Sequence, residues 1–470
     1  MLNHLKKLTV LAAALALAAC ARQPLLPDAA QLLNPGKVGL TAGKPAAVEA
    51  SWWREFKDPQ LDALIAQALV ASPSLLQARA RIMRAAAAEE AAGAAAKPSV
   101  GLGFDSTRQR YTEHGLIPPP LAGTQRTTAS LQAGLSYDWD FFGRHQAQLA
   151  AAIGASRAAE ADAAAASLML AGQITRSYLA LARILAQGRL LLLQLADSEQ
   201  SLALVQQRFA AGLDNSQTLR AAESPLPELR RQALLLDGQA SLLRHQLAAL
   251  SVQPAAALND LAPVMSLDSK PQSVSGIGLD LLGRRPDVVA ARWRVEAATQ
   301  QVTLARAQFY PNINLNAFAG FSAIGMDRLL QSGSRQFGFG PSLRLPLFDA
   351  GQLSAQLRGS AAEVDSAVAS YNAALLEAVR DASDQLSSLQ SLQLQQQEQG
   401  ALLANSQANL VLARQRFDAG IGGRQAMLNA RQALLLQQRA SLELQGLTLE
   451  AQARLMVSLG GGWQEAAPVN

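Results

Sequence analysis

The sequence predicts a mainly helical chain that contributes four transmembrane β-strands to a barrel shared with other copies of itself. Three observations predict this fold. The chain contains two copies of one unit, and each copy holds a pair of segments in which apolar and polar residues alternate. Each copy then continues into a long, uninterrupted helical pattern.

The duplication is visible as matching motifs at nearly constant offsets. The offset changes once, by five residues, within residues 98–135, as expected if one surface loop differs in length between the copies. The loop of the first copy, at about residues 111–125, is the longer one and contains three consecutive prolines. The matching pairs are Ser72-Pro73 with Arg285-Pro286 and Lys97-Pro98 with Tyr310-Pro311 at an offset of 213, then residues 143–149 with 351–357 and 208–212 with 416–420 at an offset of 208.

Residues 98–142 and 309–348 alternate with a period of two, which predicts β-strands with one apolar face. Segments of about nine to eleven residues can cross a membrane as tilted strands. The two regions hold 13 of the 22 aromatic residues. Soluble, half-buried hairpins also alternate, but the aromatic clustering and the glycine- and asparagine-rich opposite face favour lipid outside and water inside. The predicted apolar face comprises Val100, Leu102, Phe104, Leu131, Leu135, Tyr137, Trp139, Ile313, Leu315, Ala317, Phe337, Phe339, Leu343 and Leu345.

Helical periodicity runs from residue 144 to 211 and from 352 to 419 without a helix breaker. At 1.5 Å per residue each helix would be about 100 Å long. The apolar positions form a narrow seam rich in small residues, typical of a coiled coil. Both helices are expected to end at a glycine, Gly212 and Gly420, because glycine readily adopts the conformation that terminates a helix.

A shorter helix returns in each copy, ending near Ser251 in the first and Ser458 in the second. Pro225 and Pro227 have no counterpart in the second copy, so a kink is predicted in the first return helix alone.

The predicted strands require an oligomer. Four strands cannot close a barrel, and an open sheet would leave two unpaired edges in lipid. Two, three or four copies would give eight, twelve or sixteen strands. Eight strands leave little lumen, so three or more copies are favoured, and the pattern does not choose between three and four.

The N-terminus predicts export and a lipid anchor. Lys6 and Lys7 precede an apolar run at 8–18 that is too short to span a bilayer, so residues 1–19 are predicted to be a signal peptide. Leu17-Ala18-Ala19-Cys20 resembles the lipobox of bacterial lipoproteins, which implies a diacylglycerol and an N-acyl chain, palmitate among them, on Cys20. An ordinary signal peptide with an incidental cysteine is the alternative. Ala21, in place of aspartate, implies transfer to the outer membrane.

Composition and charge exclude several classes of protein. The formal net charge of +5 becomes about +3 without the two signal-peptide lysines, and no basic stripe indicates nucleic acid. No other segment has eighteen consecutive apolar residues without a charge, so no transmembrane helix is predicted. The single cysteine excludes an internal disulfide and a cysteine-based metal cluster.

No enzymatic site is predicted, and no cofactor or metal. The four histidines, at positions 4, 114, 145 and 245, are scattered, and no phosphate-binding loop, nucleophile elbow or metal-ligand spacing occurs. Glu89-Glu90 is interpreted as a solvated patch on an alanine-rich helix.

Several motifs, in order and in duplicate, resemble the TolC-like outer-membrane efflux proteins, in the OprM/NodT lipoprotein branch, over nearly all of the mature chain. The resemblance implies a trimer with a twelve-stranded barrel on a periplasmic α-helical barrel, docked by a periplasmic adaptor (membrane fusion) protein and an inner-membrane transporter. Its function would be the exit duct of a tripartite multidrug efflux pump. The motifs are Arg284-Arg285-Pro286-Asp287, Ala305-Arg306-Ala307, Phe309-Tyr310-Pro311, Leu347-Phe348-Asp349-Ala350-Gly351, Arg416-Phe417-Asp418-Ala419-Gly420 and Leu459-Gly460-Gly461-Gly462-Trp463.

The predicted organisation has six segments. The resemblance implies that three of them, the N-terminal segment, the linker and the C-terminus, form an equatorial domain. The segments are the signal peptide (1–19), an N-terminal equatorial segment (20–71), the first repeat (72–251), an equatorial linker (252–283), the second repeat (284–459) and a C-terminal tail (460–470).

One departure from the family concerns the gate, which lies where the long helices turn near Gly212 and Gly420. Known members carry an aspartate ring there, whereas Asn429 occupies the matching position, with Arg424 and Arg431 nearby. Such a ring would be less cation-selective and would favour anionic drugs or aromatic acids. The alternative is that the arginines face outward or pair with neighbouring acids. The gate residues of this hypothesis are Arg424, Gln425, Asn429, Arg431 and Gln432.

Two other functions are compatible with parts of the sequence. A duct for type I protein secretion has the same architecture, but lipidation and the terminal glycine run resemble the drug-efflux branch. A lipid-anchored structural coiled coil explains Cys20 and the helices but not the four duplicated strands. The transporter partner is open between resistance-nodulation-division, major-facilitator and fusaric-acid-type systems, and the non-acidic gate favours the latter two.

Overall fold

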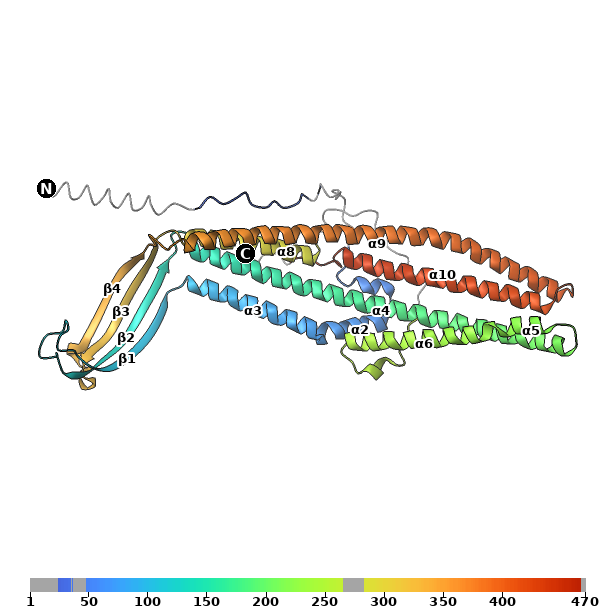
Figure 1. The fold of residues 1–470 in the computed structure, drawn as a ribbon, viewed down its shortest axis with the longest axis horizontal. Coiled ribbons are helices and arrows are strands. Elements are labelled where there is room, and N and C mark those ends of the chain that lie inside the picture. The colour runs from blue at the N-terminus through green and yellow to red at the C-terminus, as the bar shows by residue number, and fades with distance from the viewer. Residues whose placement is uncertain (1–23, 35, 37–47, 265–282, 466–470) are drawn as a thin grey trace. The chain divides into compact units, whose positions relative to one another are not determined.

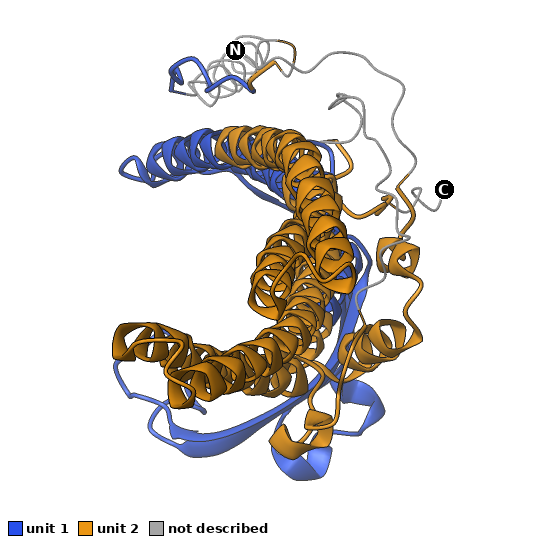
Figure 2. Cartoon of the chain, turned by 90° about the vertical axis from the view of Figure 1, so that its right-hand side faces the viewer, with its two compact units in different colours: residues 1–32, 82–159, 291–371 blue, residues 33–81, 160–290, 372–470 orange. Residues whose placement is uncertain are grey.

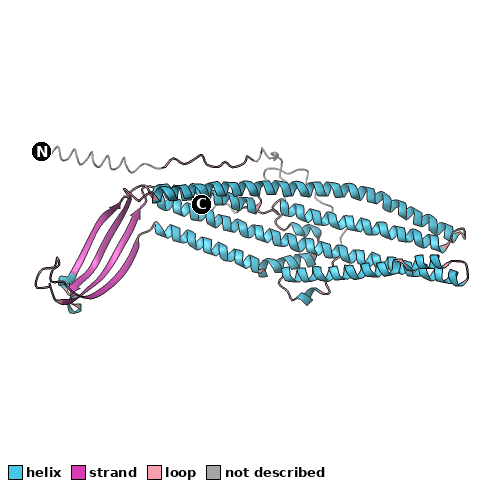
Figure 3. Ribbon diagram, viewed as in Figure 1, coloured by secondary structure: helices cyan, strands magenta, loops and turns pink. Residues whose placement is uncertain are grey.

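A computed structural model describes residues 24–34, 36, 48–264 and 283–465 (Figures 1 and 3). The predicted signal peptide, Cys20, the end of the C-terminal tail and the middle of the predicted linker lie outside the described residues. The described elements are η2 (Trp52–Phe56), α2 (Pro59–Ala71), α3 (Pro73–Ala95), β1 (Ser99–Arg110), β2 (Gln125–Trp139), α4 (Arg144–Ala210), α5 (Ser216–Glu223), α6 (Pro225–Leu250), η3 (Ala255–Leu258), α8 (Pro286–Ala307), β3 (Asn312–Ile324), η4 (Met326–Arg328), η5 (Ser332–Ser334), β4 (Arg335–Arg344), α9 (Gln352–Asp418) and α10 (Arg424–Ser458).

The order of elements confirms the predicted duplication. A helix, two strands, a very long helix and a return helix occur as α3, β1, β2, α4 and α5–α6, and again as α8, β3, β4, α9 and α10. The chain is therefore mainly helical with four strands, as the sequence predicts.

The two long helices, α4 and α9, each contain 67 residues. An aspartate caps each start: Asp140 accepts from the backbone N–H groups of residues 144–146, and Asp349 accepts from Leu353 at 2.6 Å. At their ends Gly212 and Gly420 have φ of 73° and 74°, and the residue after each glycine donates its N–H to a carbonyl five positions back. Glycine is favoured there because a side chain would strain this left-handed conformation.

The return helices differ between the copies. In the first, the helix is interrupted at Ser224, between α5 and α6, because Pro225 and Pro227 cannot donate backbone hydrogen bonds to a continuing helix. In the second, α10 continues unbroken for 35 residues. The predicted kink is thus a break into two helices.

The four strands form one antiparallel sheet in the order β1-β2-β3-β4. The strands contain 12, 15, 13 and 10 residues, so three of them are longer than the predicted nine to eleven. They are longer because pairing continues beyond the apolar stretch into polar residues, as in the pairing of Arg110 with Gln125.

The register places the predicted apolar residues on one face of the sheet, except Leu345, which follows the last residue of β4. Phe104 pairs with Leu131 and Leu131 with Phe321, while Leu135 pairs with both Val100 and Ala317. On the other face polar side chains bond across the strands: Ser136 Oγ lies 3.1 Å from Asn314 Oδ1, Asn316 Nδ2 donates to Ser342 Oγ at 3.0 Å, and Asn312 Nδ2 donates to Asp138 at 3.2 Å.

The chain divides into two compact units that cut across the repeats (Figure 2). The first unit, residues 1–32, 82–159 and 291–371, holds the sheet and the helix segments that adjoin it. The second, residues 33–81, 160–290 and 372–470, holds the rest of the helices. Each unit contains parts of both repeats, because the hairpin of the first repeat and the hairpin of the second pair into a single sheet.

The core of the second unit contains three apolar clusters, two of which include α4. One cluster joins α4 to α2 and α6 through Leu61, Ile174 and Leu247. A second joins α4 to η2 and α10 around Trp52, and a third joins α9 to α10. In Figure 2 the helices of this unit follow one another along a curve.

One described helix, α4, contains an 18-residue window of mean hydropathy 1.4, which by length and composition alone is apolar enough to cross a membrane. Helices α2 and α3 together pass the same test with a bend of 45° between them. A search for uninterrupted apolar runs does not find these segments. In the second unit Ile174, Tyr178 and Leu181 of α4 are fully buried, and 33% of the apolar window is buried in total.

Candidate functional site

The first candidate site is the start of α10, where all five predicted gate residues lie. Gln425 Nε2 donates to Ser201 Oγ of α4 at 2.6 Å, and Gln432 Nε2 donates to Ser198 Oγ at 3.1 Å. Arg424 is exposed. The structure therefore joins two predicted residues to α4 and leaves Arg424 accessible to solvent.

Arg431 forms an ion pair with Asp197 of α4, with 2.9 Å between Nε and Oδ2. The Asp197 side chain is 2% exposed and that of Arg431 is 48% exposed. Burial raises the pKa of Asp197, and the positive charge of Arg431 opposes that rise. This arrangement is the alternative left open above, in which an arginine pairs with a neighbouring acid.

Asn429 is exposed, and its Oδ1 accepts a hydrogen bond from Gln425 at 3.0 Å. At the end of α4, the Arg208 guanidinium bonds Asp214 with an Nε–Oδ2 distance of 2.9 Å, across the turn that contains Gly212. The other tip glycine, Gly420, lies in the turn that leads into α10.

The polar contacts between α4 and α10 continue away from the tip. Arg439 Nη1 donates to Gln194 Oε1 at 3.1 Å. Farther along, Arg183 bonds both Glu443, at 2.8 Å, and Glu450, at 3.1 Å. Burial lowers the pKa of Arg183, but its hydrogen bonds to Glu443 and the charge of Glu450 raise it more. A row of hydrogen bonds and ion pairs thus accompanies the apolar packing of this helix pair.

Sequence reasoning did not identify the α4 side of these contacts. Asp197, Ser198 and Ser201 are all at most 7% exposed, and they are polar positions near the end of α4. Buried polar side chains require partners. Ser198 and Ser201 follow Asp197 by one and four residues, which places the three polar side chains on one side of the helix. This spacing is the sequence signal that could have identified them.

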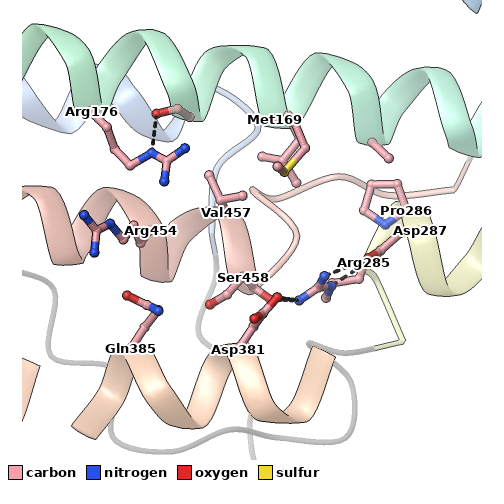
Figure 4. Close-up of a pocket in the computed structure, with 13 residues that line it drawn as sticks. Met169, Arg176, Arg285, Pro286, Asp287, Asp381, Gln385, Arg454, Val457 and Ser458 are labelled. Carbon is pink, nitrogen blue, oxygen red and sulfur yellow. Dashed lines mark hydrogen bonds and ion pairs between the residues drawn. The ribbon is translucent and has the colours of Figure 1, made fainter. Parts of the chain in front are cut away.

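The second candidate site is a cavity of 240 Å³ in the second unit (Figure 4). Arg285, from the predicted motif, reaches three elements: it bonds Asp287 at 2.7 Å, donates to the Ser458 carbonyl at 3.3 Å and lies 3.6 Å from Asp381. Arg285 is 11% exposed, and the partners raise its pKa although burial alone lowers it. The motif therefore ties the start of α8 to the end of α10 and to α9.

The opposite wall of this cavity carries two arginines with like charge, Arg176 and Arg454 (Figure 4). Burial lowers the pKa of Arg176, and the charge of Arg454 lowers it further. Asp287 and Asp381 both form ion pairs with Arg285. The charged groups that line the cavity therefore connect helices, and no two of them form a pair suited to acid–base catalysis.

The equatorial segments meet α4 at a buried tyrosine. Tyr178 donates to Asp58 Oδ2 at 2.7 Å, and the other oxygen of Asp58 caps α2 through the Gln60 N–H at 2.9 Å. Burial, followed by the hydrogen bond to Asp58 and its negative charge, raises the pKa of Tyr178. Near the C-terminus Gly461 has a φ of 58°, and a Cβ atom there would lie 2.2 Å from Leu168 Cδ1 and 3.2 Å from Trp52 Nε1.

The third candidate site is the sheet itself. Its two faces have opposite polarity, and neither β1 nor β4 has a partner on its outer edge within the described chain. Such a sheet is incomplete as a membrane structure because its edge N–H and C=O groups lack partners.

Among the described residues no group of three or more histidine, cysteine, aspartate or glutamate side chains could hold a metal ion. Three of the four histidines fall within the described part, and they do not converge. His114 lies in the β1–β2 loop, His245 lies on α6, and His145 is buried with Nε2 3.2 Å from Asp138 Oδ2.

Comparisons with known proteins agree with this geometry. Residues 64–251 and 279–461 match the family described as outer membrane efflux protein. The multidrug resistance outer membrane protein MdtP of Escherichia coli is 32% identical over 440 residues, covering 90% of this chain and 88% of that protein. The fusaric acid resistance protein FusA of Burkholderia cepacia is 36% identical over 372 residues, 76% of this chain and 69% of its own length. The crystal structure of the outer membrane protein VceC from Vibrio cholerae is similar with a TM-score of 0.79 and 34% identity, covering 89% of this chain and 100% of that one.

Proposed function

Because this chain belongs to the outer membrane efflux protein family, we propose that three copies form the exit duct of a tripartite efflux pump. The duct conducts small molecules passively from the periplasm to the exterior. Family membership makes the chain an outer-membrane protein and confirms the prediction that it is not an enzyme.

The observation that carries the proposal is the incomplete four-stranded sheet. Its outer strands are unpaired, and one face is apolar while the other is lined by glycine, serine and asparagine. Three copies give twelve strands, a closed barrel with every edge paired, lipid on the apolar face and water on the polar one. The curve that the helices of the second unit follow supports a helical duct (Figure 2).

The start of α10 is proposed as the gate of the duct. Its side chains bond α4 through Ser198, Ser201 and Asp197, so these contacts must loosen if the two helices separate. With Arg431 paired, Arg424 and Asn429 are the predicted residues left to face permeating ions. A salt-gradient reversal potential measures the selectivity, and a clear preference for cations would contradict the hypothesis of a non-acidic gate.

The partners proposed are a periplasmic adaptor and an inner-membrane transporter, which selects the substrate and supplies the energy. The relative FusA is named for resistance to fusaric acid, an aromatic acid, and it supports aromatic acids as one class of exported compound. The same relative favours a fusaric-acid-type exporter over the other transporter classes. Acylation of Cys20 is proposed as an additional anchor.

In-cell crosslinking followed by mass spectrometry tests the proposal. A photo-crosslinking amino acid at Ile421, which is 76% exposed in the α9–α10 turn, should capture an adaptor. The same group at Val100, which is 74% exposed on the apolar face of β1, should not. Whole complexes should contain a trimer and an inner-membrane transporter.

Two outcomes would replace this function with another. Recovery of a peptidase-linked secretion ATPase as the sole inner-membrane partner would indicate a duct for protein export. A monomer without any inner-membrane partner would exclude the duct and support a lipid-anchored structural coiled coil.

A further inference from the structure

An unassigned feature of the sheet is a set of arginines on its apolar face, at the end far from the helices. The side chains of alternate residues share a face, so Arg108 and Arg110 on β1 point to the same side as Val100, Leu102 and Phe104. On β4, Arg335 pairs with Phe321 and precedes Phe337 and Phe339 on that side. All three arginines are exposed.

The opposite end of the same face has a different chemistry. There Trp139 stacks on Phe141, which follows the end of β2, with ring centroids 5.3 Å apart, and Phe142 and Tyr310, in the segments that join the strands to the helices, stack at 4.8 Å. Aromatic girdles commonly mark both membrane interfaces of a barrel. In this sheet aromatic residues mark the end near the helices, whereas arginines on the two outer strands mark the other end.

The arginines lie on the strands that barrel closure joins. Residues two apart on a strand are separated by about 7 Å and neighbouring strands by about 5 Å. When β1 of one copy pairs with β4 of the next, Arg108 and Arg110 come beside Arg335 of the neighbouring copy. Arg110 bonds Glu113 at 3.3 Å, an exposed pair, while Arg108 and Arg335 have no ion-pair partner within the described chain. Each of three seams would then carry three guanidinium groups and one carboxylate.

We propose that each seam binds the phosphorylated head group of a glycolipid in the outer leaflet of the outer membrane. Guanidinium groups bind phosphate in a two-pronged geometry, and the adjacent apolar residues contact acyl chains. Arginine on a lipid-facing surface is destabilising at mid-membrane but nearly neutral at the interface, which fits its place at the strand ends. The inference rests on the proposed function, because the complete site requires barrel closure.

Native mass spectrometry of the full chain in detergent, titrated with diphosphoryl lipid A, tests this inference. The wild-type trimer should bind up to three lipids, and the triple variant R108S/R110S/R335S should bind at least tenfold more weakly. The control R126S/R328S/R344S removes the same charge from the polar face of the sheet and from a loop, and it should bind as the wild type does.

Three results would overturn the inference: unchanged lipid A affinity in the triple variant, an equal loss in the control, or equal affinity for phosphatidylglycerol. The same spectra report the number of protein copies. A wild-type chain that is not trimeric refutes the proposed duct. In that case, comparing the lipid A binding of the wild type with that of R108S/R110S tests the β1 arginines separately. A folded trimer without lipid A binding refutes the lipid site and leaves the duct intact.

Discussion

Replacing Arg431 with glutamine is expected to weaken the closed tip of the duct, because it leaves the carboxylate of Asp197 buried without its partner. Breaking a fully buried ion pair costs about 3–5 kcal/mol, and breaking an exposed one about 0.2–1 kcal/mol. The Asp197 side chain is 2% exposed and that of Arg431 is 48% exposed, so an intermediate cost applies. We expect about 1–2 kcal/mol per chain.

In the proposed trimer, three copies amplify this effect if their tips open together. The summed cost of about 3–6 kcal/mol would shift the ratio of closed to open ducts by roughly 150-fold to 20,000-fold. Single-channel recording in planar bilayers measures the open fraction directly. R431Q should show long openings at voltages where the wild type stays closed.

Two variants separate the role of this ion pair from a general loss of charge. R231Q breaks the exposed pair of Arg231 with Glu228, which are 2.7 Å apart on α6, and should leave gating unchanged. D197N/R431Q leaves no buried charge unpaired and should be closed more often than R431Q alone. Wild-type gating in R431Q, or equal leakage in R231Q, would refute the reasoning.

The same aspartate predicts a pH dependence. Burial raises the pKa of Asp197 above its ordinary value of 3.8, so the folded state holds this proton more tightly than the unfolded state. Its contribution to stability is therefore fully present below pH 3.8 and is lost as the pH rises through the folded pKa. In thermal unfolding of wild type and D197N from pH 7 to 4, the wild type should gain stability relative to the variant as the pH falls. A constant difference would exclude the linkage.

Three further predictions test the sheet, the equatorial packing and the anchor. G320A should prevent assembly of the sheet, because the new methyl group would lie 2.1 Å from a backbone oxygen of β2. The control G340A has open space around its new methyl group and should fold normally. Folding of each variant is measured as the difference in gel mobility between heated and unheated protein. Y178F removes the 2.7 Å hydrogen bond to Asp58 and should lower the free energy of unfolding by about 1–2 kcal/mol, measured by denaturant titration. C20S should abolish labelling by radioactive palmitate, and retained label would exclude this cysteine as the acylation site.

The long helices and the strands were predictable because their signals are local. A helix of 67 residues without proline shows its periodicity many times over, and the glycine that ends each one is visible in the sequence. The faces of the strands follow from alternation alone, and the register confirms them through pairs such as Leu131 with Phe321. The duplication doubled each of these signals.

The contacts at the tip were not predictable because they depend on how two helices are rotated against each other. Successive residues on a helix point about 100° apart, so an error of one position moves a side chain from the seam to solvent. The sequence therefore left Arg431 either facing the pore or paired. The position of Asp197 on α4, 234 residues earlier in the chain, decides between them. The ends of the strands were missed for a related reason, since pairing continues where the hydrophobic pattern has already stopped.

The difference between the two return helices explains why the gate contacts belong to α10. In the first copy the helix breaks at Ser224, within nine residues of its start at Ser216, so α5 is a short and exposed segment with no buried residue. In the second copy α10 is continuous from Arg424 to Ser458, so one helix carries both the polar side chains near its start and the buried apolar residues farther along. A continuous helix can transmit a displacement from its middle to its tip, whereas a break absorbs it. We therefore expect a displacement along α10 to act on the hydrogen bonds that Gln425 and Gln432 donate to Ser201 and Ser198, whereas the break at Ser224 absorbs a displacement along the first return helix.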